Sequence, residues 1–215
     1  MSPAERLRGL GLELNLGSEP ERVLEPLKAF YRQVDGALAS AAEGLGLPCR
    51  AGCDACCREA VFLSAPEFLL IAAVLFDNPP LQSEVVPRML SLAARFADEL
   101  ELLEVLPAGR ERDEVASRVK FDCPLLDAGG RCRVHAAREL NARTFGQAWD
   151  EHLDGPFGCG LTHERLTVLG GGGAPSRQGL PGARAWRESL RERVPGVGDV
   201  HVYPWWFDRY RTWME

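Results

Sequence analysis

Apolar residues recur at helical spacing along much of this chain, and short breaks of proline, glycine and polar residues separate the helical stretches. Residues 1–17 show no clear periodicity and are interpreted as a mixed lead-in. Ser18 and Glu21 fit a capping box, and the helix that they open is expected to run to about Glu43 and to stop at Gly44. Five apolar residues form its inward stripe: Leu24, Leu27, Tyr31, Val34 and Leu38.

A second capping box, formed by Ser64 and Glu67, predicts a helix that runs to Asp77. This helix is apolar nearly all round, which indicates burial on several sides. Pro79 and Pro80 are expected to end it. Further helices are expected over three ranges: residues 84–106, 110–120 and 183–193.

The last third of the chain combines a predicted short strand, a glycine run and an aromatic tail. The strand is expected over Arg165–Leu169, and the glycines at 170–173 are interpreted as a flexible turn because no phosphate-binding Lys-Ser/Thr follows them. The tail contains six aromatic residues: Tyr203, Trp205, Trp206, Phe207, Tyr210 and Trp213. We expect the tail to dock on the core rather than to form an exposed partner surface.

These patterns predict a mostly α-helical single domain. Residues 1–47 would form an N-terminal helical segment, and residues 48–160 a core with inserted helices. Residues 161–215 would add a C-terminal helix and the aromatic tail, packed on that core.

Composition and charge exclude several classes of protein. The 215 residues are 46% hydrophobic and 26% charged, and the net charge is −6. This balance argues against a general nucleic-acid binder. The longest apolar run, Phe68–Phe76, is too short to span a membrane, and the N-terminal residues carry no apolar signal core. We therefore expect a cytoplasmic protein whose thiols are reduced.

Cysteines are clustered in a way that ordinary core packing does not require. The first cysteine segment, Pro48–Arg58, holds Cys49, Cys53, Cys56 and Cys57. A helix, or a turn leading into a short helix at Gly52, would bring their sulfurs to one side. Thiolates suit soft metals and electron exchange, so this segment predicts a metal or redox centre.

A second cysteine segment, residues 121–135, resembles a small hairpin or knuckle. The turn residues at 127–130 lie between Cys123 and Cys132, and His135 follows three positions later as a ligand or a hydrogen-bond donor to sulfur. Arg138 and Arg143 are expected on a helix that continues through Trp149, where their charge would offset thiolates. Cys159 could close the site, and His152 and His163 are weaker candidates.

Two other classes of protein use part of this spacing. Cys49, Cys53 and Cys56 match the three-cysteine spacing of enzymes that hold a 4Fe–4S cluster and S-adenosylmethionine, but a long predicted helix precedes them here instead of a barrel strand. A thiol oxidoreductase using Cys53-x-x-Cys56 would need a preceding strand in a βαβ pattern, which the sequence lacks.

Taken together, the motifs resemble the YkgJ-type cysteine-cluster proteins, a family described as zinc- or iron-chelating. A related domain occurs in flagellin lysine methylases. The resemblance covers roughly residues 48–160. It depends on these motifs: Cys49-x3-Cys53-x2-Cys56-Cys57, Cys123-Pro-Leu, Cys132-Arg-Val-His135, Arg138 and Arg143-Thr-Phe145. In this chain Glu139 and Ala142 stand where the family usually has Pro and Cys, so one usual ligand is missing, and His135 or Cys159 is expected to replace it.

We therefore expect a metal-binding protein with an iron–sulfur cluster or iron, and less readily zinc, because a doubled cysteine suits a multi-atom centre. The expected ligands are Cys49, Cys53, Cys56, Cys57, Cys123, Cys132, Cys159 and His135. Either a redox or protein/peptide-modifying component or a non-catalytic module with structural zinc fits the sequence. A protein or peptide partner is expected, without nucleic acid or membrane. Catalytic residues and oligomeric state stay open.

Overall fold

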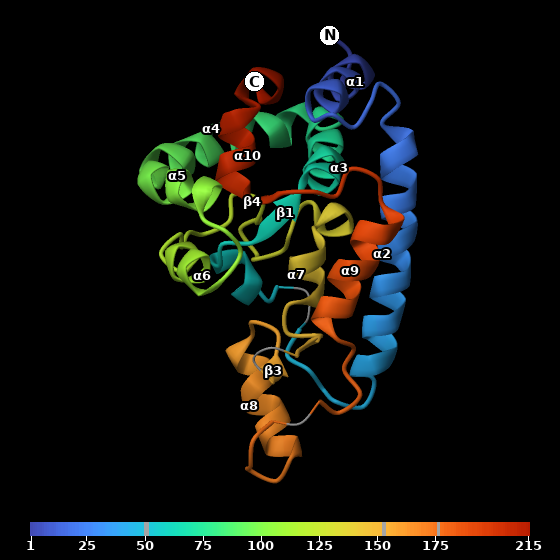
Figure 1. The fold of residues 1–215 in the computed structure, drawn as a ribbon, viewed down its shortest axis with the longest axis vertical. Helices are drawn as coiled ribbons and strands as arrows, with labels where there is room; N and C mark the ends of the chain where they lie inside the picture. The colour runs from blue at the N-terminus through green and yellow to red at the C-terminus, as the bar shows by residue number, and fades with distance from the viewer. Residues whose placement is uncertain (50–51, 152–153, 176) are drawn as a thin grey trace.

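Helices dominate the computed structural model, which describes residues 1–49, 52–151, 154–175 and 177–215 (Figure 1). The mostly α-helical single domain is confirmed. Its α-helices are α1 (Pro3–Glu13), α2 (Glu21–Ala42), α3 (Ala65–Phe76), α4 (Pro79–Arg95), α5 (Ala97–Val105), α6 (Arg110–Ala116), α7 (Leu140–Thr144), α8 (Gly160–Leu169), α9 (Ala183–Arg193), α10 (Tyr203–Arg209) and α11 (Arg211–Met214). The other elements are the 3₁₀ helices η1 (Ala55–Arg58) and η2 (His135–Ala137) and the strands β1 (Phe62–Ser64), β2 (Trp149–Asp150), β3 (Gly155–Pro156) and β4 (Val200–Val202).

The main hydrophobic core lies where α1, α2, α3, α4 and α10 meet. α3 is buried on several sides, as its apolar sequence predicts, and all five stripe residues of α2 are buried. The aromatic tail docks on this core: the Phe68 ring stacks on Trp206 at 5.3 Å, and Phe207 is fully buried. The Trp206 indole also donates a hydrogen bond to the Leu63 carbonyl at 3.0 Å.

A buried capping box fixes the start of α3. Glu67 accepts hydrogen bonds from the Ser64 backbone N–H at 2.7 Å and from the Ser64 hydroxyl at 2.8 Å, as the sequence predicts. Its second oxygen accepts from the Tyr31 hydroxyl and the Leu140 N–H. One carboxylate therefore ties α2, α3 and α7 together.

The N-terminal expectations need two corrections. Residues 1–17 are not irregular, because Ser2 and Glu5 form a capping box that opens α1. Ser18 makes no capping bond at α2, which begins after Pro20 and ends at Ala42. A capping box needs local backbone geometry, and the spacing of two residue types alone does not provide it.

Helix boundaries differ from the sequence prediction at three further places. Asp77 already ends α3, and Pro79 and Pro80 begin α4, since proline is tolerated in a first helical turn. The expected helix over residues 84–106 is divided at Phe96 into α4 and α5. The segment 165–169 belongs to α8 and is not a strand.

Two short antiparallel pairings join distant parts of the chain. β1 pairs with β4, with Phe62 opposite Val202, and β2 pairs with β3. In Figure 1, α9 lies alongside the long α2, both termini lie at one end of the molecule, and α8 lies at the other end. Among the described residues, no helix combines the length and the apolar character needed to cross a membrane.

Candidate metal centre

The first cysteine segment is a turn followed by a short 3₁₀ helix. Gly52 has a φ of +86°, a conformation that favours glycine, and η1 carries Cys56 and Cys57. The Cys57 N–H donates to the Asp54 carbonyl at 2.9 Å, which closes the turn. Of the two conformations predicted from sequence, the turn leading into a short helix is therefore the one that forms. Residues 50 and 51 lie outside the described residues.

The second cysteine segment forms the predicted hairpin. Leu126 and Cys132 form an antiparallel bridge, and the Gly130 N–H donates to the Asp127 carbonyl at 3.0 Å. The Asp127 side chain also accepts from the Gly129 and Arg131 N–H groups at 2.8 and 2.9 Å. An aspartate that bonds the backbone ahead of it fixes a tight turn, so Cys123 and Cys132 are held at neighbouring positions.

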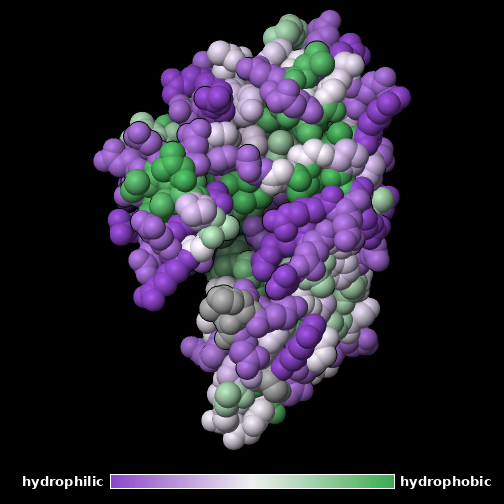
Figure 2. Space-filling model, viewed as in Figure 1, coloured by the Kyte–Doolittle hydropathy of each residue, from purple (hydrophilic) through white to green (hydrophobic). Residues whose placement is uncertain are grey.

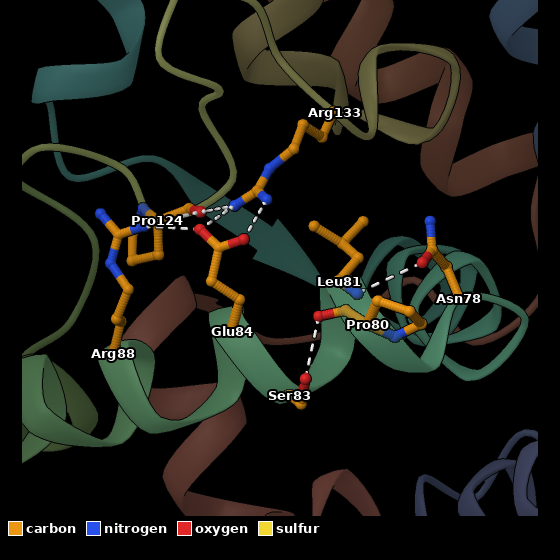
Figure 3. A network of polar contacts seen from close by, with 8 residues as sticks. All are labelled: Asn78, Pro80, Leu81, Ser83, Glu84, Arg88, Pro124 and Arg133. Carbon is orange, nitrogen blue, oxygen red and sulfur yellow. Dashed lines mark hydrogen bonds and ion pairs between the residues drawn. The ribbon is translucent and has the colours of Figure 1, made fainter.

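Arg133 anchors this hairpin to α4 (Figure 3). Its guanidinium contacts both oxygens of Glu84, at 2.6 and 3.0 Å, and donates to the Pro124 carbonyl at 2.8 Å. Asn78 caps the start of the same helix by accepting from the Leu81 N–H at 3.2 Å. The hairpin is therefore fastened to an element of the main core.

Two contacts bring the cysteine segments together. The Cys123 N–H donates to the Cys57 carbonyl at 3.1 Å. Nearby, Gly130 packs against Gly52 so closely that a Cβ on Gly130 would lie 3.3 Å from the Gly52 carbonyl oxygen. Because Gly130 also has a φ of +73°, a side chain there would be strained as well as crowded. Two segments about 70 residues apart thus meet backbone to backbone.

A third segment brings Cys159 to Cys49. The loop around Gly146 is held by the pairing of β2 with β3, and the Thr162 hydroxyl donates to the Gly146 carbonyl at 3.0 Å. A Cβ on Gly146 would lie 2.9 Å from the Cys159 Cβ and 3.2 Å from the Cys49 sulfur. Glycine at this position therefore allows both cysteines to approach the same point.

All seven cysteines line two adjoining cavities. The larger cavity has a volume of about 370 Å³, and its cysteines are Cys53, Cys56, Cys57, Cys123 and Cys132. The smaller cavity has a volume of about 180 Å³, and its cysteines are Cys49, Cys53, Cys56 and Cys159. His135 lines both cavities from an exposed position, whereas His163 lines neither, and His152 lies outside the described residues. The molecular surface is indented between α6 and the end that carries α8 (Figure 2).

The two arginines of the predicted motif have different positions. Arg138 lines both cavities. Arg143 is 1% exposed: it pairs with Asp35 at 2.5 Å, donates to the Ala136 and Arg138 carbonyls, and lies over the Tyr31 ring. Arg143 is therefore a structural residue in this fold. The predicted helix through Trp149 is also wrong, since only the five residues of α7 are helical there.

Burial and neighbouring sulfurs change the acidity of the thiols. Burial raises the pKa of Cys49 to about 11 and that of Cys123 to about 12, and it also raises the pKa of Cys132. A hydrogen bond between the adjacent thiols of Cys56 and Cys57 lowers the pKa of Cys56 to about 7 and raises the pKa of Cys57. Cys56 is therefore the thiol of this pair that ionises first.

The residue types at the cavities fit a soft metal centre. All seven cysteines are free thiols, and thiolates are the usual ligands of iron–sulfur clusters, iron and zinc. Within the described part of the chain, however, no three His, Cys, Asp or Glu side chains lie close enough together to hold a single metal ion. The cysteines line two adjoining cavities, and those in the described part of the chain do not form one closed shell.

Glu139 and Ala142 also line the larger cavity, and neither was among the predicted ligands. Glu139 is 1% exposed, and its Oε2 accepts a hydrogen bond from the Tyr203 hydroxyl. Burial raises the pKa of this carboxyl to about 7. The sequence signal for Glu139 was its place in the motif, where a proline was expected. Ala142, where the family usually has cysteine, lines both cavities without offering a donor atom.

Comparisons with protein-family models, with curated proteins and with solved structures found no match for this chain.

Proposed function

We propose that this chain binds an iron–sulfur cluster or iron at the two cysteine-lined cavities. The observation that carries the proposal is that three separate stretches of chain bring all seven cysteines to two adjoining cavities. Seven sulfurs exceed what one tetrahedral zinc ion needs. Their number and their spread around a volume of about 370 Å³ suit a centre of several atoms.

We further propose that the protein works as a redox component, or as a component that modifies a protein or peptide, in the cytoplasm. Free thiols are what a reducing compartment maintains. Arg138 lines both cavities, and a cation beside thiolates offsets their negative charge. A cavity with room beside the sulfurs favours an open centre over a closed structural site.

The test is elemental analysis with an absorption spectrum on protein purified without oxygen. The proposal predicts brown protein that contains iron and acid-labile sulfide, or iron alone. Colourless protein with one zinc per chain would support the alternative, a non-catalytic module with a structural zinc site. Protein without bound metal would contradict both.

Single replacements in η1 test whether its two cysteines bind the metal. Cys56→Ser and Cys57→Ser should each lower the metal content, since serine keeps the size of the side chain but removes the soft ligand. Ala55→Ser is the matched control, because it adds the same hydroxyl to the same 3₁₀ helix and removes no sulfur. Normal metal content in both cysteine variants would remove them from the ligand set.

A further inference from the structure

A largely apolar groove adjoins the two cysteine-lined cavities. It has a volume of about 360 Å³, and its apolar lining includes Val61, Phe62, Phe145 and Phe157. α6 forms one side and the residues just ahead of α8 form the other, where Figure 2 shows green, apolar atoms at the bottom of the indentation. Glu59 and Val61 also line the larger cysteine cavity, and Phe145 also lines the smaller one. A group bound in the groove therefore lies beside the cysteines.

The polar side chains of the groove offer hydrogen-bond acceptors. Glu59 and Asp113 line it, and among the described residues no Lys or Arg does. Asp113 is exposed and has no ion pair with any residue that the structure describes. The Asn141 amide donates to the Phe62 carbonyl at 2.6 Å, and the Ser117 hydroxyl donates to a carbonyl of α6 at 2.7 Å. The groove therefore suits a ligand that carries donors and positive charge.

The aromatic rings of the groove favour the same kind of ligand, because the face of an aromatic ring attracts a cation. Two of the rings already hold a guanidinium of this chain from outside the groove. Arg112 lies over Phe62 at 4.8 Å, and Arg187 lies over Phe157 at 5.3 Å. Phe145 has no such partner among the described residues, so its ring is left for a cation that enters the groove.

We propose that this groove binds a cationic side chain, Lys or Arg, of a protein or peptide partner; as the partner class of the proposed component, this inference rests on the proposed function. The stem of such a side chain packs on the apolar lining while its charged head reaches the carboxylates. Lys120 pairs with Glu59 at 3.5 Å, but both side chains are exposed, and a pair of this kind is weak enough to be displaced. The net charge of −6 attracts the same partner from a distance.

The experiment titrates the protein with Gly/Ser peptides that differ only in a central Leu-Lys-Leu, Leu-Met-Leu or Leu-Glu-Leu, using calorimetry. Metal per chain is measured on the same samples, purified without oxygen. The Lys peptide should bind about tenfold more tightly than the Met peptide, because Met keeps much of the apolar stem and lacks the charged donors. The Glu peptide should not bind, and the affinity for the Lys peptide should fall as salt is added.

Two exposed positions of the groove have matched control variants elsewhere in the chain. Asp113→Asn should weaken binding of the Lys peptide several-fold, whereas Asp98→Asn, in the first turn of α5 and outside the groove, should not. Ser117→Lys gives the groove a cation of its own and should abolish binding. Ser83→Lys should not, although Ser83 is also exposed and also donates to the carbonyl three residues before it.

Equal affinity for the Lys and Met peptides would overturn the inference, as would natural affinity in both Asp113→Asn and Ser117→Lys. Absence of Lys-peptide binding by protein that contains metal would also overturn it and would leave the proposed function intact. Binding that depends on the Lys, by protein that contains no metal, would support the inference and contradict the proposed function itself.

Discussion

The helical core and the cysteine region of this protein are held together in different ways. In the core, long helices bury aromatic and aliphatic side chains, and the buried carboxylate of Glu67 has four donors. Around the cavities, turns and 3₁₀ helices meet through backbone hydrogen bonds, and one oxygen of Glu139 has no hydrogen-bond partner among the described residues. We therefore expect the core to be stabilised by its own packing, and the cysteine region to depend in addition on the metal that we propose it binds.

Removal of the metal should give the largest difference between the two regions, because it should loosen the cysteine region and leave the helical core intact. After chelation, amide hydrogen exchange should rise to nearly unprotected rates at Cys123 and Gly130, whose hydrogen bonds hold the cysteine segments. Amides inside α2 and α3 should keep their protection. Equal exchange rates at Cys123 and Gly130 before and after chelation, in protein shown to contain metal, would contradict this division.

Phe68→Ala should destabilise the helical core and leave the cysteine-lined cavities unchanged. Phe68 is fully buried and stacks on Trp206, so the variant should lose about 3–5 kcal/mol of unfolding free energy. Denaturant titration measures the loss, and Leu161→Ala, at an exposed position on α8, is the control. The metal content of the folded fraction should stay unchanged. A fall in metal per folded chain would show that the regions are not separable.

The pH dependence of the metal-free protein should report on Glu139. Its pKa is raised from 4.5 to about 7 by burial, so the folded state binds the proton more tightly than the unfolded state does. The resulting stabilisation is fully present below about pH 4.5 and is lost as the pH rises to about 7, on the order of 3 kcal/mol in all. Unfolding titrations across this range should show the decline, and Glu139→Gln should remove most of it. Equal slopes in both proteins would contradict the assignment.

Gly130→Ala should produce the smallest of these effects, on the order of 1–2 kcal/mol. The added methyl group would be crowded by the Gly52 carbonyl and would sit on a backbone with φ of +73°. Metal content should fall more than global stability does, because the change acts where the two cysteine segments meet. Gly173→Ala, in open space and without a positive φ, is the matched control.

Much of the helical core could be predicted from sequence because its signals are local. The stripe of α2, the capping box of α3 and the bounds of α9 follow from spacings of three or four residues. Ser18 and Glu21 show the limit of that method, since the same spacing did not give a capping bond at α2.

The residues that make up the candidate site could be predicted from the sequence, but the long-range side-chain contacts around it could not. The cysteine spacings and the turn at Asp127 indicated the two segments and the hairpin. The burial of Arg143 against Asp35, and the bond of Glu139 to Tyr203, join residues 108 and 64 positions apart. Such pairs are set by the packing of whole elements, and no local pattern marks them.

Anomalous diffraction from crystals of the anaerobically purified protein, measured at the iron absorption edge, tests the central claim most directly. The account predicts anomalous peaks in the larger cavity, within bonding distance of sulfurs from both the first and the second cysteine segment. Peaks bonded to one segment alone, or iron held away from both, would contradict it.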